Sequence, residues 1–177
     1  MTEETFVSIT ERLKTIWKKD FLDNEVEMEV WYRLLSDIPD NVAIAAANTY
    51  MATKVYPPKP ADIREIAVSI TQKETGELTS AEAFSLYWKA VSNGIYGAQK
   101  EYDALPEIVQ RASGGVGAIQ AAAMDENTNY DVEKALFEKR FNTIKSQMTE
   151  EAKIPESVKI AINGILQQRL EEKHEIT

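Results

Sequence analysis

Val55-Tyr56-Pro57-Pro58-Lys59-Pro60 is the stretch that decides how this chain is organised. A proline lacks a backbone N–H and biases the residue before it towards an extended conformation, so a helix cannot run through three prolines in four residues. On both sides of the stretch, apolar residues recur at the three- and four-residue spacing of helices. We therefore expect a rigid extended link between two helices, with Pro60 as the first residue of the second one.

Three amphipathic helices are predicted before this link and one after it. Thr2 and Asn24 have the side chains that accept hydrogen bonds at a helix N-terminus, and Pro39 favours a helix start. The four predicted helices cover residues 3–19, a segment that opens at Asn24 and has its apolar face between Val26 and Leu35, the segment from Pro39 to Thr53, and the segment from Pro60 to about Gly76.

The polar segment around Gly76 is the best candidate for a domain boundary. Gly76 is the first glycine of the chain, and its neighbours from Lys73 to Thr79 are polar or charged, as in linkers between domains. We expect two small helical modules joined near Gly76, an N-terminal domain over residues 1–76 and a C-terminal domain over residues 77–177.

The second half also reads as helical. Thr79 and Glu82 form a capping-box pattern before a helix whose apolar spacing extends to Ile95. Further helices are predicted from Pro106 to Ser113, from Ala118 to Met124, around Phe137 to Met148, and from Pro155 onwards. No strand-like alternation is present in the sequence, so the predicted fold class is all-α.

Composition restricts the class of protein. The chain has 177 residues, a net charge of −9 and no cysteine, which excludes disulfides and thiol chemistry. An excess of acidic residues disfavours tight binding to bare nucleic acid through charge neutralisation, so we expect nucleic-acid contact to be indirect or weak. Because no apolar run could span a bilayer, we expect no membrane contact and a location in the cytoplasm of the host cell.

Candidate catalytic and metal-binding patterns are all incomplete. His174 is the only histidine and lies near the C-terminus, where a catalytic triad could not be held in place. The acidic run from Asp125 lacks the glycine and the final glutamate of a calcium loop. The glycine turn Ser113–Gly117 has neither the lysine nor the preceding strand of a phosphate-binding P-loop. We expect no enzymatic activity, no cofactor, and no catalytic, cofactor-binding or metal-binding residues.

One alternative is a small helical DNA-binding protein, such as a phage regulator or a packaging-initiation subunit. The helices on either side of the proline link could form a helix-turn-helix, with Lys54, Lys59 and Arg64 as the residues that face DNA. Two acidic residues, Asp62 and Glu65, flank Arg64 and weaken this interpretation.

The order of residues in the first half resembles the N-terminal domain of the phage replicative-helicase loader/inhibitor family. The resemblance runs from Ile9 to Ala67 and consists of an aromatic turn, a tryptophan helix, an alanine-rich helix, the aromatic-Pro-Pro link and an Ile-x-Glu-Ile helix. In this chain these are Trp17–Phe21, Val30–Asp37, Val42–Tyr50, Tyr56–Pro58 and Ile63–Ile66.

The second half is similar to the C-terminal helical extension of longer members of this family. The shared elements are a tryptophan helix, a tyrosine-glycine turn, a Leu-Pro element, a glycine turn and a phenylalanine-rich helix. In this chain they are Trp88, Tyr96-Gly97, Leu105-Pro106, Gly115–Gly117 and Phe137–Phe141.

The resemblance implies a non-catalytic phage DNA-replication factor. Such a protein binds the hexameric replicative helicase, inhibits its ATPase and unwinding activities, and loads it onto single-stranded DNA at the origin, with an origin-binding replisome organiser as a further partner. This is an expected protein–protein interaction role.

We expect the helicase to contact the last helix, through Ile160, Leu166 and Leu170. Apolar residues there cover an arc wider than one neighbouring helix would bury, with Ile160 beside a set predicted to point inwards, namely Val158, Ile162, Ile165, Leu166 and Leu170. An equally strong interpretation is that this helix is buried on several sides.

Overall fold

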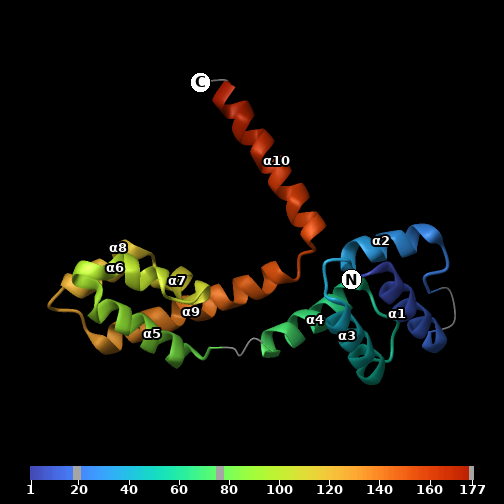
Figure 1. The fold of residues 1–177 in the computed structure, drawn as a ribbon, viewed down its shortest axis with the longest axis horizontal. Helices are drawn as coiled ribbons and strands as arrows, with labels where there is room; N and C mark the ends of the chain where they lie inside the picture. Colours follow the sequence, from blue (N-terminus) through green and yellow to red (C-terminus); the bar gives the residue numbers. More distant parts are fainter. Residues whose placement is uncertain (18–20, 75–77, 176–177) are drawn as a thin grey trace. The chain divides into compact units, whose positions relative to one another are not determined.

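The computed structural model describes residues 1–17, 21–74 and 78–175, with the backbone alone at Glu74, Leu170 and residues 172–175. Over these residues the chain forms ten helices and no strand, which confirms the predicted all-α fold (Figure 1). The helices are α1 (Glu3–Ile16), α2 (Glu25–Leu35), α3 (Asp40–Thr53), α4 (Pro60–Glu74), α5 (Ser80–Ser92), α6 (Gly94–Asp103), α7 (Glu107–Ser113), α8 (Val116–Met124), α9 (Tyr130–Ala152) and α10 (Glu156–Glu175).

The chain divides into two compact units, and the first is built from two separate pieces. Unit 1 consists of Met1–Thr75 together with Glu151–Thr177, and unit 2 consists of Gly76–Glu150. Residues 151–177, which we expected in the C-terminal domain, group with the N-terminal residues. Gly76, the expected junction, lies outside the described residues, and independent folding of the two modules stays a prediction.

Local capping signals produce the helix starts that the sequence predicts. The Thr2 hydroxyl accepts a hydrogen bond from the Thr5 N–H at 3.2 Å, and the Asn24 side chain accepts one from the Glu27 N–H at 2.8 Å. Thr79 and Glu82 form a reciprocal capping box at the start of α5. Each cap satisfies a backbone donor that the first helical turn leaves unpaired.

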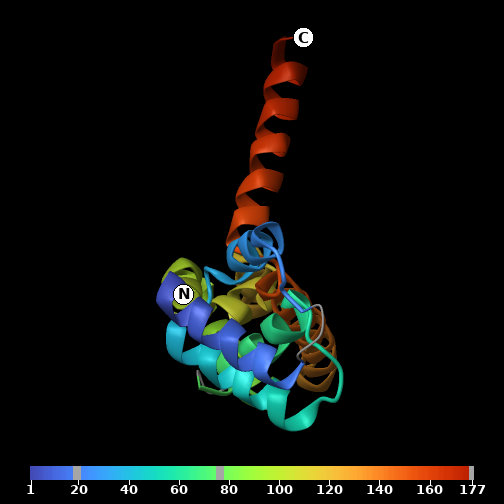
Figure 2. The ribbon, with the colours of Figure 1, turned by 90° about the vertical axis from the view of Figure 1, so that its right-hand side faces the viewer.

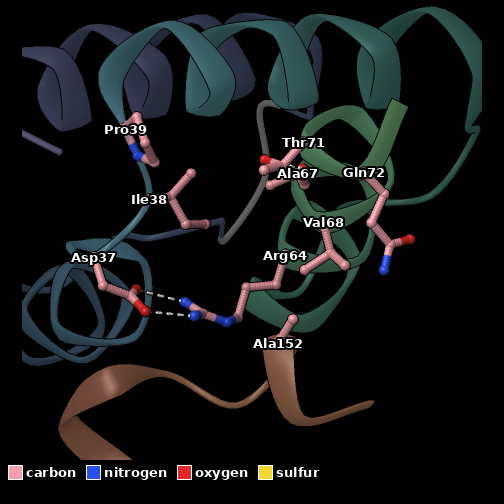
Figure 3. A pocket seen from close by; sticks show the side chains of 9 residues that line it. All are labelled: Asp37, Ile38, Pro39, Arg64, Ala67, Val68, Thr71, Gln72 and Ala152. Atoms are coloured by element: carbon pink, nitrogen blue, oxygen red, sulfur yellow. Dashed lines mark hydrogen bonds and ion pairs between the residues drawn. The ribbon is translucent and has the colours of Figure 1, made fainter. Parts of the chain in front are cut away.

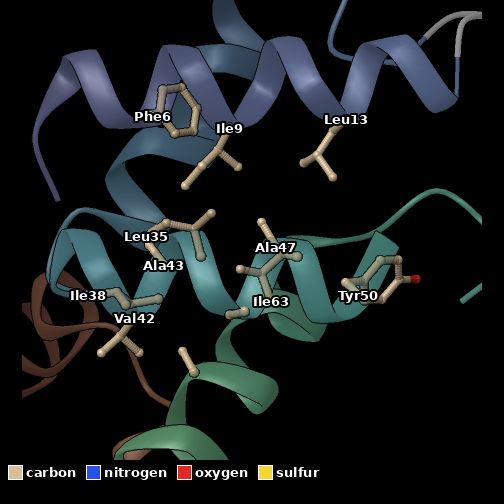
Figure 4. Close-up of a cluster of buried hydrophobic side chains, with 12 residues drawn as sticks. Phe6, Ile9, Leu13, Leu35, Ile38, Val42, Ala43, Ala47, Tyr50 and Ile63 are labelled. Carbon is tan, nitrogen blue, oxygen red and sulfur yellow. The ribbon is translucent and has the colours of Figure 1, made fainter. Parts of the chain in front are cut away.

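The core of unit 1 forms around α3. Phe6, Ile9 and Leu13 project from α1 towards the alanine-rich face of α3, and Ile63 approaches that helix from α4 (Figure 4). In the second view, α1 and α3 lie side by side (Figure 2). Small side chains on α3 allow both neighbours to come close; Ala43, Ala46 and Ala47 are all less than 2% exposed.

The proline link is held at both ends, with Val55, Tyr56 and Pro57 exposed and Pro58 buried. The Trp17 indole N–H donates to the Val55 carbonyl at 2.9 Å, and the Lys59 N–H donates to the Asp62 carboxylate at 2.7 Å. Between these anchors the side chains of Val55 and Tyr56 are 83% and 80% exposed. Helix α4 begins at Pro60, as the sequence predicts.

The core of unit 2 is aromatic. Phe137 of α9 stacks on Tyr87 of α5 with ring centroids 4.7 Å apart, and it also contacts Phe84 and Phe141. All four rings are at most 1% exposed. Trp17, Trp31 and Trp88 are only partly buried and pack against the two cores.

The helix predicted to run through Ile95 is interrupted. Helix α5 ends at Ser92, and α6 begins at Gly94. Gly94 lies against α8, because a Cβ atom at this position would stand 3.0 Å from a methyl carbon of Ile119. A Cβ atom here would force Ile119 to shift, and Ile95, in the first turn of α6, is 42% exposed.

Helix α7 ends where the glycine turn was predicted to stop it. Gly114 has a φ of +84° and Gly115 a φ of +96°, in the left-handed region that residues with a Cβ atom disfavour.

Along the part of the chain that the structure describes, no helix combines the length and the apolar composition needed to cross a membrane.

Candidate partner-binding surfaces

Helix α10 carries the candidate helicase-binding residues, and its described side chains are exposed. Ile160 is 64% exposed, Leu166 is 52% exposed, and Leu170 lies outside the residues whose side chains are described. Val158, Ile162 and Ile165, which we expected to point inwards, are 36%, 45% and 55% exposed. That expectation is wrong, because in unit 1 the described side chains of α1 to α4 bury one another and leave α10 uncovered.

The start of α10 is held by an ion pair between the buried Arg64 and the more exposed Asp37. The guanidinium of Arg64 donates two hydrogen bonds to the Asp37 carboxylate, both at 2.6 Å, and a third to the Leu34 carbonyl at 2.7 Å (Figure 3). Arg64 is only 6% exposed. A bidentate arginine–carboxylate pair constrains the orientation of both side chains as well as pairing their charges.

The same two side chains reach the segment that leads into α10. Arg64 Nε donates to the Lys153 carbonyl at 2.8 Å, and Asp37 accepts a hydrogen bond from the Glu156 N–H at 3.0 Å. We call Arg64, Asp37 and the backbone of residues 153–156 the Arg64 joint. The joint ties the beginning of α10 to α4 and to the end of α2.

Electrostatics keep Asp37 ionised in the joint. Partial burial raises the pKa of its carboxyl, but the hydrogen bonds from Arg64 and from the Glu156 N–H, with the charge of Arg64, lower that pKa below the ordinary value of 3.8. The carboxylate is also in position to satisfy the first free N–H of α10, as an acidic cap does.

A small apolar cavity lies beside the joint. It measures about 210 Å³, and Ile38, Ala67 and Val68 line it together with the joint's own Asp37 and Arg64 (Figure 3). The cavity could take a single apolar side chain but is smaller than the usual site for a small-molecule ligand.

The three residues proposed to face DNA do not form one surface. Lys54 and Lys59 are exposed at the ends of the proline link. Arg64 instead lies buried in the joint, where its N–H groups are used by Asp37 and by backbone carbonyls. Its burial corrects the sequence interpretation of Arg64, since the guanidinium cannot reach a phosphate from this position.

Sequence reasoning missed the pairing of Arg64 with Asp37. The two residues are 27 positions apart, and Lys153 is 89 positions from Arg64. The sequence offered one weak signal for this pairing: Arg64 lies on a helix beside Ile63 and Ala67, which are core residues.

Within the described residues, no group of three metal-ligating side chains comes together.

Comparison with known proteins identifies a family over the first part of the chain. Residues 1–64 match the family model described as "G39P, N-terminal domain". The match covers α1 to α3, the proline link and the first turn of α4, ending at Arg64. No curated protein and no solved structure matches the chain.

Proposed function

Residues 1–64 form a G39P-type N-terminal domain, the domain of a phage helicase loader and inhibitor family, and from this premise we propose a function for the whole chain. The protein is a non-catalytic phage replication factor. It binds the hexameric replicative helicase, inhibits its ATPase and unwinding activities, and delivers it to single-stranded DNA at the origin, with an origin-binding replisome organiser as a further partner.

The exposed apolar surface of α10 supports a protein–protein role. An amphipathic helix that lays its apolar side into a groove is a recurring mode of partner recognition. Ile160 and Leu166 are both more than half exposed, and their burial in a partner would remove apolar area from water. The helicase-binding residues we propose are therefore Ile160, Leu166 and Leu170.

The Arg64 joint supports presentation of α10 at a fixed place on the family domain. Because Asp37 and Arg64 hold residues 153–156, the start of α10 is ordered before a partner arrives. Ordering in advance lowers the entropy cost of binding. The family domain thus acts as the base from which α10 contacts the helicase.

Inhibition follows from unequal binding to the conformations of the helicase ring. A partner shifts a conformational equilibrium only by the difference between its affinities for the two states. A loader that binds one ring conformation more tightly holds the ATPase in that state, and it is released when single-stranded DNA stabilises another conformation.

The test is the light-scattering mass of the full chain mixed with the phage or host replicative helicase, with and without ATP. We expect a nucleotide-dependent complex with several copies of the protein per hexamer, and a lower ATPase rate in that complex. Mass profiles that stay separate with every candidate helicase would overturn the proposal, and duplex DNA binding through Lys54 and Lys59 would be measured next.

The variants Ile160→Asp and Leu166→Asp test whether these two side chains contact the helicase. Both side chains are exposed, so the variants should fold and lose the complex. Gln168→Asp is the matched control, since it places the same charge on the same helix without removing an apolar side chain. Equal loss of binding in all three variants would show a general charge effect and contradict a specific α10 contact.

A further inference from the structure

The proline link presents a tyrosine ring to solvent between two lysines. Tyr56 is mostly exposed, and Lys54 and Lys59 are exposed before and after it in the chain. Among the residues that the structure describes, the Tyr56 ring stacks on no other ring, and neither lysine side chain forms an ion pair. A ligand can therefore reach the ring and both ammonium groups. We call Lys54, Tyr56 and Lys59 the Tyr56 platform.

The backbone that carries Tyr56 is fixed on both sides of the ring. Before it, the Trp17 indole N–H holds the Val55 carbonyl, and after it the Asp62 carboxylate holds a backbone N–H of the link. Pro58 is buried, and each proline of the link has a restricted φ. The ring is thus presented by an ordered backbone, which lowers the entropy cost of binding a ligand.

The platform lies in the longest stretch of the chain without an acidic residue. Residues 41–61 contain no Asp or Glu, and their two basic residues are Lys54 and Lys59, although the whole chain has 29 acidic residues. Asp40, which precedes this stretch, lies about 20 Å from Lys54 along α3, because a helix rises about 1.5 Å per residue. That distance exceeds the Debye length of about 10 Å at about 0.1 M salt.

The first carboxylate after this stretch does not cancel its charge. Asp62 accepts the Lys59 N–H with its side chain. With Asp62 included, residues 41–62 still carry two basic side chains and one acidic one. The platform is therefore a locally positive surface in an acidic protein, and such a surface attracts anions.

We propose that the Tyr56 platform binds single-stranded nucleic acid, with a base stacked on the Tyr56 ring and phosphates beside Lys54 and Lys59. Every base has a flat π-face, so stacking on an aromatic side chain tolerates any sequence. Lysine binds phosphate as a point charge. The chain from Lys54 to Lys59 spans at most about 18 Å, which leaves room for a nucleotide between the two cations. That the strand is DNA rests on the proposed function.

A protein groove that binds proline-rich peptides is the competing occupant, and the structure disfavours it. Pro57 and Pro60 have the P-x-x-P spacing that such grooves bind in an extended peptide. Of the three prolines of the link, however, only Pro57 is exposed, since Pro58 is buried and Pro60 is the first residue of α4. The side chains that the link offers are a ring and two cations, which suit a polyanion with flat bases.

The test is fluorescence anisotropy of a labelled oligo-dT with the full chain at low salt, without helicase. Tyr56→Ala should weaken binding about fivefold or more, because it removes a stacking surface. Tyr56→Phe keeps the ring and should bind as the parent does. Tyr96→Ala is the matched control, since it removes a tyrosine that is 100% exposed in unit 2, and it should leave binding unchanged.

The salt dependence of binding separates the lysines from the ring. Lys54→Gln and Lys59→Gln each remove one phosphate contact, so each should lower the slope of log K against log salt by about 0.7. Tyr56→Ala should weaken binding without changing this slope. Lys89→Gln makes the same charge change at an exposed position in unit 2 and should change neither the affinity nor the slope.

Three results would overturn the site. The first is no anisotropy change at low salt, which would favour a protein occupant. The second is equal affinity of the parent and Tyr56→Ala, or unchanged salt slopes in both lysine variants. The third is duplex DNA that binds as tightly as oligo-dT, because paired bases are stacked on one another and cannot reach the ring. Since helicase is absent from these measurements, their failure leaves the loader proposal intact, and failure of helicase binding leaves them unaffected.

Discussion

Helices α3 and α10 both belong to unit 1 and both carry many apolar residues, yet one is the centre of the core and the other is exposed. In α3, Ala46 is 0% exposed and Val42 is 5% exposed. In α10, Ile160 is 64% exposed. The apolar residues of α3 are mostly small, whereas those of α10 are mostly large.

The difference shows that burial depends on what a helix has to pack against. Small side chains let α1 and α4 approach α3 from two sides, and these three helices with α2 enclose one core. Helix α10 follows the four helices that enclose this core, and the Arg64 joint holds its first residues. Its described large apolar side chains are left exposed, and exposed apolar surface frequently marks a protein-binding site.

The largest effect should come from breaking the joint that connects α10 to the core. Asp37→Ala leaves the buried guanidinium of Arg64 without its counter-charge; because the Asp37 side chain is 27% exposed, the loss should lie at the lower end of the about 3–5 kcal/mol that removal of one partner of a fully buried ion pair costs. Urea unfolding of the full chain measures this loss. Asp23→Ala, which removes an exposed carboxylate, is the control; equal shifts in the two variants would contradict a structural role for the pair.

A smaller effect on stability is expected when an alanine is replaced by leucine, once in α3 and once in α10. Ala46→Leu adds volume to a fully buried site in α3 and should destabilise the protein by about 1–3 kcal/mol. Ala161→Leu makes the same change at an exposed site in α10 and should stay within about 0.5 kcal/mol of the parent. The thermal unfolding midpoints of the two variants test this difference between α3 and α10. Equal midpoints would contradict it.

The pH dependence of the joint should follow Asp37. Because its pKa is below 3.8 in the folded protein, the stabilisation by the carboxylate is complete above that value and is lost as the pH falls through the folded pKa. Unfolding free energies of the parent and of Asp37→Asn should therefore differ more at pH 7 than near pH 3. A difference that is the same at both pH values would show that the charge of Asp37 does not matter.

The smallest effect on stability is expected from Ile160→Asp. The side chain is mostly exposed, so the unfolding free energy should change by less than about 0.5 kcal/mol, even though helicase binding is lost. Differential scanning calorimetry of the variant measures this. A loss of several kcal/mol would mean that α10 is buried in solution and would remove the contrast with α3.

Local signals in the sequence predicted the helices and many of their ends. Pro60, the Thr79–Glu82 capping box and the glycine turn after Ser113 act within a few residues, and the structure has each in its predicted place. The family of the N-terminal domain could also be predicted from the sequence, because the resemblance depends on the order of aromatic, proline and alanine segments.

Features that depend on distant residues were not predictable in this way. The break before Gly94 lies where α8 packs closely against the chain, and the inward position of Arg64 depends on Asp37 and on residues 153–154. The exposure of α10 likewise depends on a core that other helices complete. Helical spacing identifies a face but does not state which element covers it.

The Arg64 joint also has a consequence for the order in which the protein is made. Arg64 leaves the ribosome about 90 residues before Lys153 and Ile154, whose carbonyls accept its hydrogen bonds. At about 5–20 residues per second, this delay is roughly 5–18 seconds. During that time all of unit 2 is synthesised while the joint is still open. The joint then closes last, and a nascent chain that has not reached residue 156 cannot yet begin α10.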